Sequence, residues 1–417
     1  MKIVHFADTH IGVETYGSLD AASGLSTRVL DELRSLDTVI EYAVENNADL
    51  ALFCGDVYKN REPSQTHQRE FASRILKLSR ARIPTVIVTG NHDLPGAQGK
   101  ANSVDIFETL RIDYIHIADR PEVLKIETPS GLVQVAAFPW LRRNALLARD
   151  EVKNLSVSEM MKLMQGVMSA RLTSLADEID PSYPAVLASH IAVSSARTGT
   201  EKSMMLGNDP VVTLSTIANP VYDYVALGHV HRRQVLSETP PVVYAGSMER
   251  LDFSDEKEDK GFYVVDIDTT TKPRSVSYAF QPVQARRFLT LQAELAEDEL
   301  DPTGKVLSLI ASASETVKGA VVRLKLSLPG SIAPMVRDSD ILKALKEAYN
   351  VSISKEIHRE AVSRASGWLK EGLSPVEALK NYIDDRGVSP ERQKLLLEYA
   401  EKLIETRLSA DRGTYAV

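Results

Sequence analysis

Residues 2–10 read KIVHFADTH, and this stretch decides the fold class of the chain. The apolar run over residues 2–7 predicts a β-strand that ends directly before Asp8 and His10. From about Thr27 to Asn46, apolar side chains recur three and four residues apart, which predicts an amphipathic helix. A short apolar strand followed by such a helix is the start of an α/β fold.

The same strand pattern recurs further along the chain. Apolar runs predict strands over residues 49–54, 85–89, 133–138, 185–189 and 222–227, with helical patterns over 70–79 and 156–176. Polar residues follow most of these strands directly; they are Asp56, Asn91, His92, Asp93, His190, His229 and His231. Because the carboxyl ends of strands in an α/β sheet share one rim, these distant residues are expected to converge there.

The residue types at this rim predict a site for hard divalent metals. Five of the nine histidines are candidate ligands at strand ends, together with the carboxylates of Asp8 and Asp56 and the amide of Asn91. Carboxylate and imidazole ligands without a thiolate suit Mn²⁺, Fe²⁺ or Zn²⁺. Two such ions about 3.5–4 Å apart can activate water and hold both the attacking and the leaving oxygen of a phosphoryl group. The pattern therefore predicts a dimetal phosphoester hydrolase.

Each motif has a plainer interpretation when it is taken alone, as a loop or a turn. Their joint occurrence at successive strand ends is what favours the metal site. The other histidines have different settings. His5 and His116 lie inside apolar strand patterns and are expected in the core, His67 lies on or before a helix, and His358 lies in the distal part of the chain; we assign none of them to the site.

Composition narrows the class of protein. A length of 417 residues with 43% hydrophobic and 25% charged residues predicts two or three globular domains. The single cysteine, Cys54, excludes an intrachain disulfide and a cysteine-based metal site. No apolar run approaches the ~20 residues of a membrane span, and Asp8 comes too early for a signal peptide, so we expect a cytoplasmic protein without a membrane role.

The formal net charge of −8 argues against binding nucleic acid by bulk charge alone. Screening, however, limits the effect of exposed charges to about 10 Å at 0.1 M salt, so the local field at the metals can oppose the acidic average. Polar residues near 269–274 suggest a linker, after which strands and helices alternate and then only helical patterns follow. We expect domains over residues 1–270, 286–359 and 360–417.

The series from Asp8-Thr9-His10 to Gly228-His229-Val230-His231 resembles the calcineurin-like metallophosphoesterase superfamily. Within it, the chain resembles the SbcD-type DNA repair nucleases. Residues 244–254, YAGSMERLDFS, and the KGF at 260–262 carry this closer resemblance, together with the start of the chain. It implies an α/β fold: a β-sandwich flanked by helices, a small α+β capping domain and a C-terminal helical tail.

The resemblance also implies a role for each residue of the rim. Asp8, His10 and His231 would hold one metal ion, Asn91, His190 and His229 the other, and Asp56 would bridge the two. We expect both ions to be Mn²⁺. His92 would be catalytic and not a metal ligand; it would stabilise or protonate the phosphodiester leaving group. Asp93 would orient the imidazole of His92, or alternatively serve as a simple turn residue.

The activity implied is that of a DNA nuclease in double-strand break repair, recombination and replication. Such enzymes are 3′-to-5′ exonucleases on double-strand ends and endonucleases on single strands and hairpins; they act as homodimers in a heterotetramer with an SbcC-type ABC ATPase. Two features separate the chain from protein phosphatases: no second Asp-Arg pair follows Asp56, and Asp93 stands where a glutamate is usual. A small-molecule or cyclic-nucleotide phosphodiesterase and a catalytically idle scaffold remain alternatives.

Basic residues near the motifs are candidates for contacts with DNA phosphates, which position the duplex without reading its sequence. They are Lys59, Arg61, Arg142, Arg143, Arg232 and Arg233, with Arg286 and Arg287 further along. Ordinary solvated surface is the alternative for each pair. In the tail, Leu396, Leu403 and Ile404 form a stripe that would dock on the coiled coil of the ATPase or, alternatively, pack on its own domain.

Overall fold

The computed structural model describes residues 1–95, 100–141, 155–198, 209–358, 374–385 and 390–412. Its first large sheet has six strands in the order β14-β13-β1-β2-β3-β4. Strands β1 to β4 run parallel, whereas β13 and β14 pair antiparallel at one edge. Their bounds are β1 Lys2–Phe6, β2 Leu50–Phe53, β3 Thr85–Val88, β4 Ile115–Ala118, β13 Gly261–Asp268 and β14 Ser275–Pro282.

The second large sheet also has six strands, in the order β11-β12-β10-β7-β6-β5. The four central strands are parallel, and each edge strand pairs antiparallel with its neighbour. Their bounds are β5 Glu122–Thr128, β6 Gly131–Phe138, β7 Ala185–His190, β10 Tyr224–Gly228, β11 Gln234–Glu238 and β12 Pro241–Tyr244.

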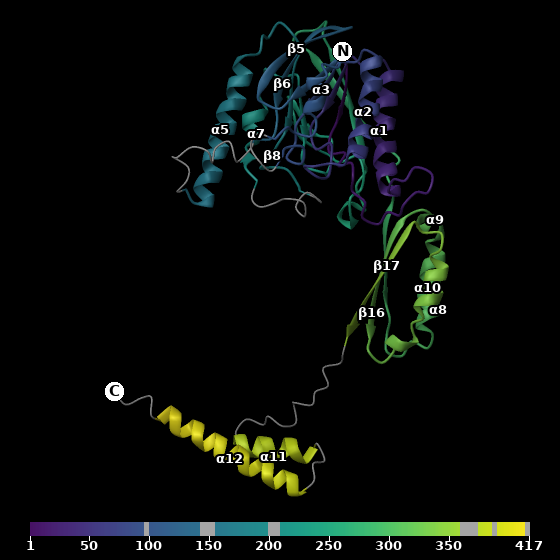
Figure 1. Ribbon diagram of the computed structural model, residues 1–417, viewed down its shortest axis with the longest axis vertical. Coiled ribbons are helices and arrows are strands. Elements are labelled where there is room, and N and C mark those ends of the chain that lie inside the picture. The colour runs from purple at the N-terminus through teal and green to yellow at the C-terminus, as the bar shows by residue number, and fades with distance from the viewer. Residues whose placement is uncertain (96–99, 142–154, 199–208, 359–373, 386–389, 413–417) are drawn as a thin grey trace. The chain divides into compact units, whose positions relative to one another are not determined.

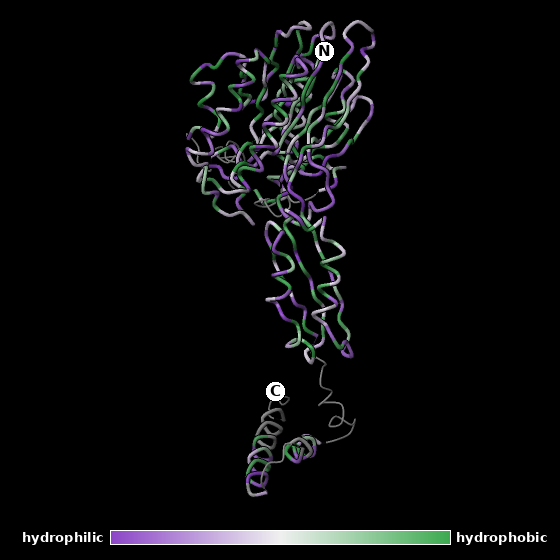
Figure 2. The backbone as a smooth tube through the Cα atoms, turned by 90° about the vertical axis from the view of Figure 1, so that its right-hand side faces the viewer, coloured by the Kyte–Doolittle hydropathy of each residue, from purple (hydrophilic) through white to green (hydrophobic). Residues whose placement is uncertain are grey.

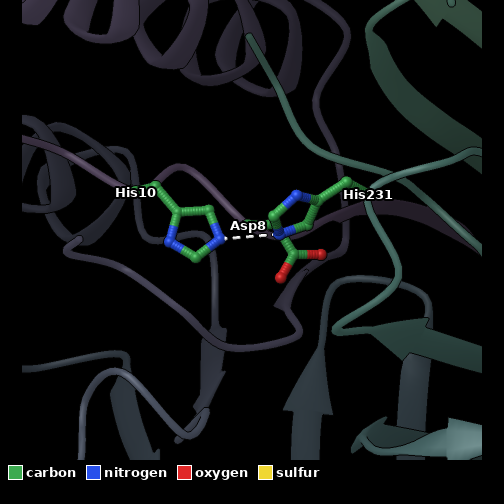
Figure 3. Close-up of side chains that lie close together, drawn as sticks. All are labelled: Asp8, His10 and His231. Atoms are coloured by element: carbon green, nitrogen blue, oxygen red, sulfur yellow. Dashed lines mark hydrogen bonds between the residues drawn. The ribbon is translucent and has the colours of Figure 1, made fainter. Parts of the chain in front are cut away.

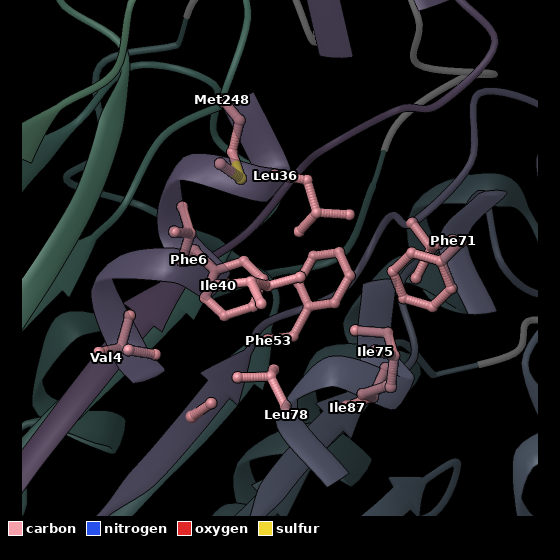
Figure 4. Packing of buried hydrophobic residues seen from close by; sticks show 14 of the residues in the cluster. Val4, Phe6, Leu36, Ile40, Phe53, Phe71, Ile75, Leu78, Ile87 and Met248 are labelled. Atoms are coloured by element: carbon pink, nitrogen blue, oxygen red, sulfur yellow. The ribbon is translucent and has the colours of Figure 1, made fainter. Parts of the chain in front are cut away.

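Alternation of side chains along the strands builds a layered core. Phe6 and Phe53 pack in the apolar cluster that lies under the helices α1 and α2 (Figure 4). Their neighbours along the same strands, such as Ile3 and Leu52, belong instead to a second cluster shared with strands of the other sheet. Because successive residues of a strand point to opposite faces, one buried strand serves both clusters.

Helices cover the outer faces of the two sheets. A third apolar cluster joins the second sheet to α5 and α7, on the side away from α1 and α2 (Figure 1). This arrangement confirms the predicted α/β class, with two sheets flanked by helices. The bounds are α1 Thr27–Glu45, α2 Gln65–Arg80, α3 Asp105–Thr109, α5 Val157–Asp177 and α7 Leu214–Ile217. Figure 2 shows stretches of hydrophobic residues alternating with hydrophilic ones along the backbone of the part that contains the N-terminus.

Smaller elements complete the description. A two-stranded sheet pairs β8 with β9, and a three-stranded sheet has the order β15-β16-β17. The bounds are β8 Ala192–Val193, β9 Val211–Val212, η2 Phe253–Asp255, β15 Phe288–Glu294, α8 Pro302–Ser312, α9 Ser314–Val317, β16 Val321–Pro329, η3 Ala333–Met335, α10 Asp338–Ala344, β17 Asn350–His358, α11 Pro375–Asp385 and α12 Pro390–Arg412. Within the described ranges, every helix is too short or too polar to span a lipid bilayer.

By contacts, the chain forms two compact units. The first comprises residues 1–292, 306–325 and 338–354, and the second comprises 293–305, 326–337 and 355–417. The first unit contains both large sheets and all the strand ends considered below. The domain bounds 1–270, 286–359 and 360–417 stay a prediction.

Candidate metal centre

The strand ends of the two large sheets meet in one cluster of potential ligands. Ligand atoms of Asp8, His10 and His231 lie within 4.8 Å of one another, as Figure 3 illustrates. Two further groups meet the same limit: His10 with Asp56 and His92, and Asp8 with Asp56 and His190. Since the three groups share members, they form a single cluster, drawn from β1, β2, β3, β7 and β10.

One half of the cluster centres on two imidazoles. Nε2 of His10 lies 2.9 Å from Nε2 of His231 and 3.7 Å from a carboxylate oxygen of Asp56. Two imidazole nitrogens this close need either a proton between them or a cation that both can ligate. The buried Nδ1 of His10 has no hydrogen-bond partner among the described residues. Both histidines are buried, and burial lowers the pKa of His10 to about 3, which leaves its ring neutral.

The other half centres on the amide of Asn91. Its Oδ1 lies 3.1 Å from Nε2 of His190 and 3.3 Å from Nδ1 of His229. Nδ1 of His190 hydrogen-bonds the carbonyl oxygen of Cys54 at 2.7 Å, so Nε2 is its free ligand atom. Burial by itself would lower the pKa of His190, but the carboxylates of Asp56 and Asp8 raise it to about 9.

This donor set fits two divalent cations. It combines two buried carboxylates, an amide oxygen and several imidazoles whose ring nitrogens lie close together, and no thiolate takes part. Burial opposes ionisation of Asp56, yet the neighbouring His190 and His92 hold the pKa of that carboxyl well below its usual range. The carboxylate is thus ionised and ready to ligate, and a cation would take the place of the proton on His190.

The backbone of this rim is strained. Asp8, His10, Asp56 and His229 all have positive φ, between 46° and 96°. Left-handed conformations cost side-chain-bearing residues about 1–2 kcal/mol each, and they persist where the surrounding structure fixes them. Hydrogen bonds from Asp8 N to Gly55 O (3.0 Å) and from His10 N to Asp56 O (3.1 Å) tie the two loops together. The strain sits on the residues expected to ligate metal.

Glycines allow the loops to approach so closely. A Cβ on Gly90 would lie 2.2 Å from Oδ1 of Asp56, and a Cβ on Gly228 would lie 1.9 Å from the carbonyl oxygen of Cys54. Both distances are far below van der Waals contact, and both obstacles are parts of the site. The glycines in the Gly-Asn-His and Gly-His-Val-His motifs are therefore required by packing.

His92 lies at the edge of the cluster, half-buried. Its Nδ1 lies 2.6 Å from the carbonyl oxygen of Lys59, and its backbone N–H donates to Oδ1 of Asp56 at 2.8 Å. A carbonyl can only accept, so Nδ1 carries the proton and Nε2 is the nitrogen able to exchange a proton with a leaving group. The ring centroid lies 5.0 Å from that of His10.

Asp93 supports the loop of Asp56. Its buried carboxylate accepts from the backbone N–H groups of Asp56, Val57 and Gly90, each at 2.9 Å. The imidazole of His92 is instead oriented by the carbonyl of Lys59. Burial, reinforced by the charge of Asp56, raises the pKa of Asp93 to about 6.

Three residues at the site lay outside the sequence predictions. The ring centroid of Trp140 lies 5.0 Å from that of His229, and a carboxylate oxygen of Asp209 lies 3.7 Å from Nε2 of His229. The buried Lys260 donates to the carbonyl of His231. Trp140 carried a signal because it follows the strand predicted over residues 133–138, and Lys260 stands in the KGF stretch quoted for the resemblance, although no role was predicted for it.

The predicted DNA contacts have varied surroundings. Arg232 lies 3.3 Å from Glu258, and Arg233 lies 3.0 Å from Asp259 and covers the ring of Phe280. Arg61 is exposed, Lys59 offers its carbonyl to His92, and Arg142 and Arg143 lie outside the described residues.

Arg286 and Arg287 make internal contacts. Arg286 forms a bidentate pair with the buried Asp31, and Arg287 donates to the carbonyls of Glu315 and Lys318. Both guanidinium groups therefore already have protein partners.

Comparison with known proteins identifies the family of this chain. The model of the family described as calcineurin-like phosphoesterase matches residues 1–233. A solved structure from Thermus thermophilus is 14% identical, covers 66% of this chain and 97% of its own, and has a TM-score of 0.34. A dimetal phosphatase from Danio rerio is 12% identical, covers 64% and 92%, and has a TM-score of 0.34. The match over more than half of the sequence, at the residues that build the cluster, shows that the chain belongs to the calcineurin-like phosphoesterases, which are metal-dependent hydrolases.

Proposed function

We propose that this chain is a DNA nuclease of the SbcD type. It hydrolyses phosphodiester bonds, as a 3′-to-5′ exonuclease on double-strand ends and an endonuclease on single strands and hairpins, together with an SbcC-type ATPase and as a homodimer. The observation that carries the hydrolytic part is the two-carboxylate, multi-histidine cluster with His92 at its edge. The choice of DNA is supported by the resemblance of residues 244–254 and 260–262 to SbcD-type nucleases. The helices and strands that follow residue 233, where the family match ends, also support it.

The residues of the cluster have separate proposed roles in metal binding and proton transfer. Asp8, His10 and His231 would hold one ion, Asn91, His190 and His229 the second, with Asp56 between them. When bound, two divalent cations, proposed to be Mn²⁺, supply activated water and charge stabilisation at the phosphoryl group. His92, with Nδ1 held by the Lys59 carbonyl, donates a proton from Nε2 to the departing 3′-hydroxyl oxygen. A sugar alkoxide is a poor leaving group, so this proton transfer is needed for phosphodiester cleavage.

A comparison of substrates tests the proposal. Mn²⁺-dependent cleavage of an end-labelled DNA duplex and of a hairpin is measured beside hydrolysis of bis-p-nitrophenyl phosphate, with the full chain and with its ATPase partner. We expect cleavage of all three substrates. Hydrolysis of the small ester alone would overturn the nuclease assignment and favour a small-molecule phosphodiesterase.

The role of His92 has its own test. We expect His92→Ala to lower kcat on DNA by about 10²–10⁴-fold, the usual contribution of a general acid. Mn²⁺ binding, followed by calorimetry, should change little. His116→Gln, in strand β4 and away from the cluster, is the control variant and should keep wild-type kcat. A His92→Ala enzyme that binds metal and cleaves DNA at the wild-type rate would contradict the assigned role.

A further inference from the structure

Lys260 is a buried cation beside the metal centre. Only about 1% of its side chain is exposed. Its place is directly before β13, outside residues 1–233 that match the family model. A buried ammonium group loses its hydration, so it is retained only where protein groups replace the water. The partners of this ammonium therefore show what it does.

The ammonium group has three partners, and one is the backbone of a metal-ligand candidate. Nζ donates to the carbonyl oxygen of His231 at 3.0 Å and to Oγ of Ser247 at 2.8 Å, and it lies 3.3 Å from a carboxylate oxygen of Asp255. The backbone N–H of Ser247 donates to the same His231 carbonyl at 3.0 Å. Two donors, one of them charged, thus fix the peptide unit that follows the His231 ring.

Two flanking ion pairs extend this attachment along the chain. The residues after His231 pair with the residues before Lys260: Arg232 with Glu258 at 3.3 Å and Arg233 with Asp259 at 3.0 Å. These pairs are partly exposed, so each contributes little by itself. Lys260 is the buried member of the set, and its bond to the His231 carbonyl is the one closest to the cluster.

We propose that Lys260 is a positioning residue for one metal site. By holding the carbonyl of His231, it fixes the direction of that imidazole toward His10 and Asp8. None of the three partners of Nζ belongs to the other group of ligands, Asn91, His190 and His229. Loss of the ammonium group should therefore weaken the site of His231 selectively. This inference deepens the proposed function, because it concerns the same metal centre.

The test measures metal binding without DNA. The full chain is stripped with a chelator and titrated with Mn²⁺ by calorimetry, while electron paramagnetic resonance separates single ions from coupled pairs. The variants are Lys260→Met and Lys260→Met with Asp255→Asn, since the double variant leaves no unpaired buried carboxylate. Lys257→Met is the matched control, because Lys257 is exposed in the same segment.

We expect one of the two Mn²⁺ equivalents to bind about 10–100-fold more weakly in both Lys260 variants, with the other changed less than about threefold. Activity on bis-p-nitrophenyl phosphate should fall at low Mn²⁺ and recover at saturating Mn²⁺. Equal weakening of both equivalents, no weakening, or failure of both variants to fold would overturn the proposal, since each outcome denies a selective role. Inactivity of the wild type on DNA would refute the nuclease and leave this result intact.

Discussion

At the scale of single residues, the partners of a buried histidine, and not its burial, distinguish a core residue such as His5 from the histidines of the metal centre. His5 is fully buried between the sheets, with Nδ1 3.0 Å from the hydroxyl of Tyr224 and Nε2 3.3 Å from the carbonyl oxygen of Leu227. Burial lowers the pKa of His5 to about 3. Its ring therefore stays neutral in the folded protein, which has a consequence for stability.

Folding stability should fall on acidification because of His5. Above pH 6.5, the ring is neutral in both the folded and unfolded states and its contribution is complete. As the pH falls below 6.5, His5 is protonated in the unfolded chain but stays neutral in the folded protein. The free energy of unfolding therefore decreases by ~1.4 kcal/mol per pH unit, down to about pH 3. Denaturant unfolding from pH 7 to 4.5 measures this slope. His5→Gln should have a shallower slope, and identical slopes would contradict the assignment.

A second prediction for a single residue concerns the effect of Gly90→Ala on metal binding. In Gly90→Ala, the new methyl group would lie 2.2 Å from Oδ1 of Asp56, so it must displace the carboxylate proposed to bridge the metals. We expect at least tenfold weaker Mn²⁺ binding and a similar loss of hydrolysis. Gly166→Ala, in helix α5 with nothing within 4 Å of the new Cβ, is the control. The control should stabilise the protein by about 0.5–1 kcal/mol and leave metal binding unchanged.

At the scale of elements, the helix α12 carries an apolar face without a cover in the described residues. Leu395, Leu396, Tyr399 and Leu403 are 53%, 42%, 62% and 70% exposed. Large exposed apolar side chains on one helix are typical of a surface that docks another helix. We therefore propose this face as the docking surface of the tail.

The tail prediction follows from this face. Leu396→Asp with Leu403→Asp should reduce copurification with the SbcC-type ATPase by at least tenfold, because two charges would be buried in the interface. Hydrolysis of bis-p-nitrophenyl phosphate by the same variant should match that of the wild type. Glu398→Gln, exposed on the same helix, is the control. Undiminished copurification would refute the proposed docking surface.

At the scale of the whole molecule, charge limits how DNA can be held. The net charge is −8, and Arg232 and Arg233 already pair with acidic residues. We expect the chain alone to bind a duplex weakly and the ATPase partner to supply much of the affinity. Fluorescence anisotropy with a labelled duplex, at several salt concentrations, measures both cases. Tight binding that does not depend on the partner would count against this expectation.

The parallel strands of the fold could be predicted because each one is a continuous apolar run in the sequence. Buried parallel strands such as β2 and β3 are continuous apolar runs, and the polar residues after them are visible in the sequence. The approach of these ends is also foreseeable, because parallel strands end at one rim. Edge strands such as β5 and β14, with several exposed residues, lack this signal and were not predicted.

The sequence by itself determined the α/β class and the residue types at each strand end, because apolar period and side-chain chemistry are local properties. The tertiary structure alone decided what holds those residues: the Lys59 carbonyl on His92, the three N–H groups on Asp93 and the ammonium of Lys260 on His231. Most of these contacts involve backbone atoms, which every residue possesses. The sequence pattern therefore cannot predict these contacts, because they form only when the folded chain brings the residues together.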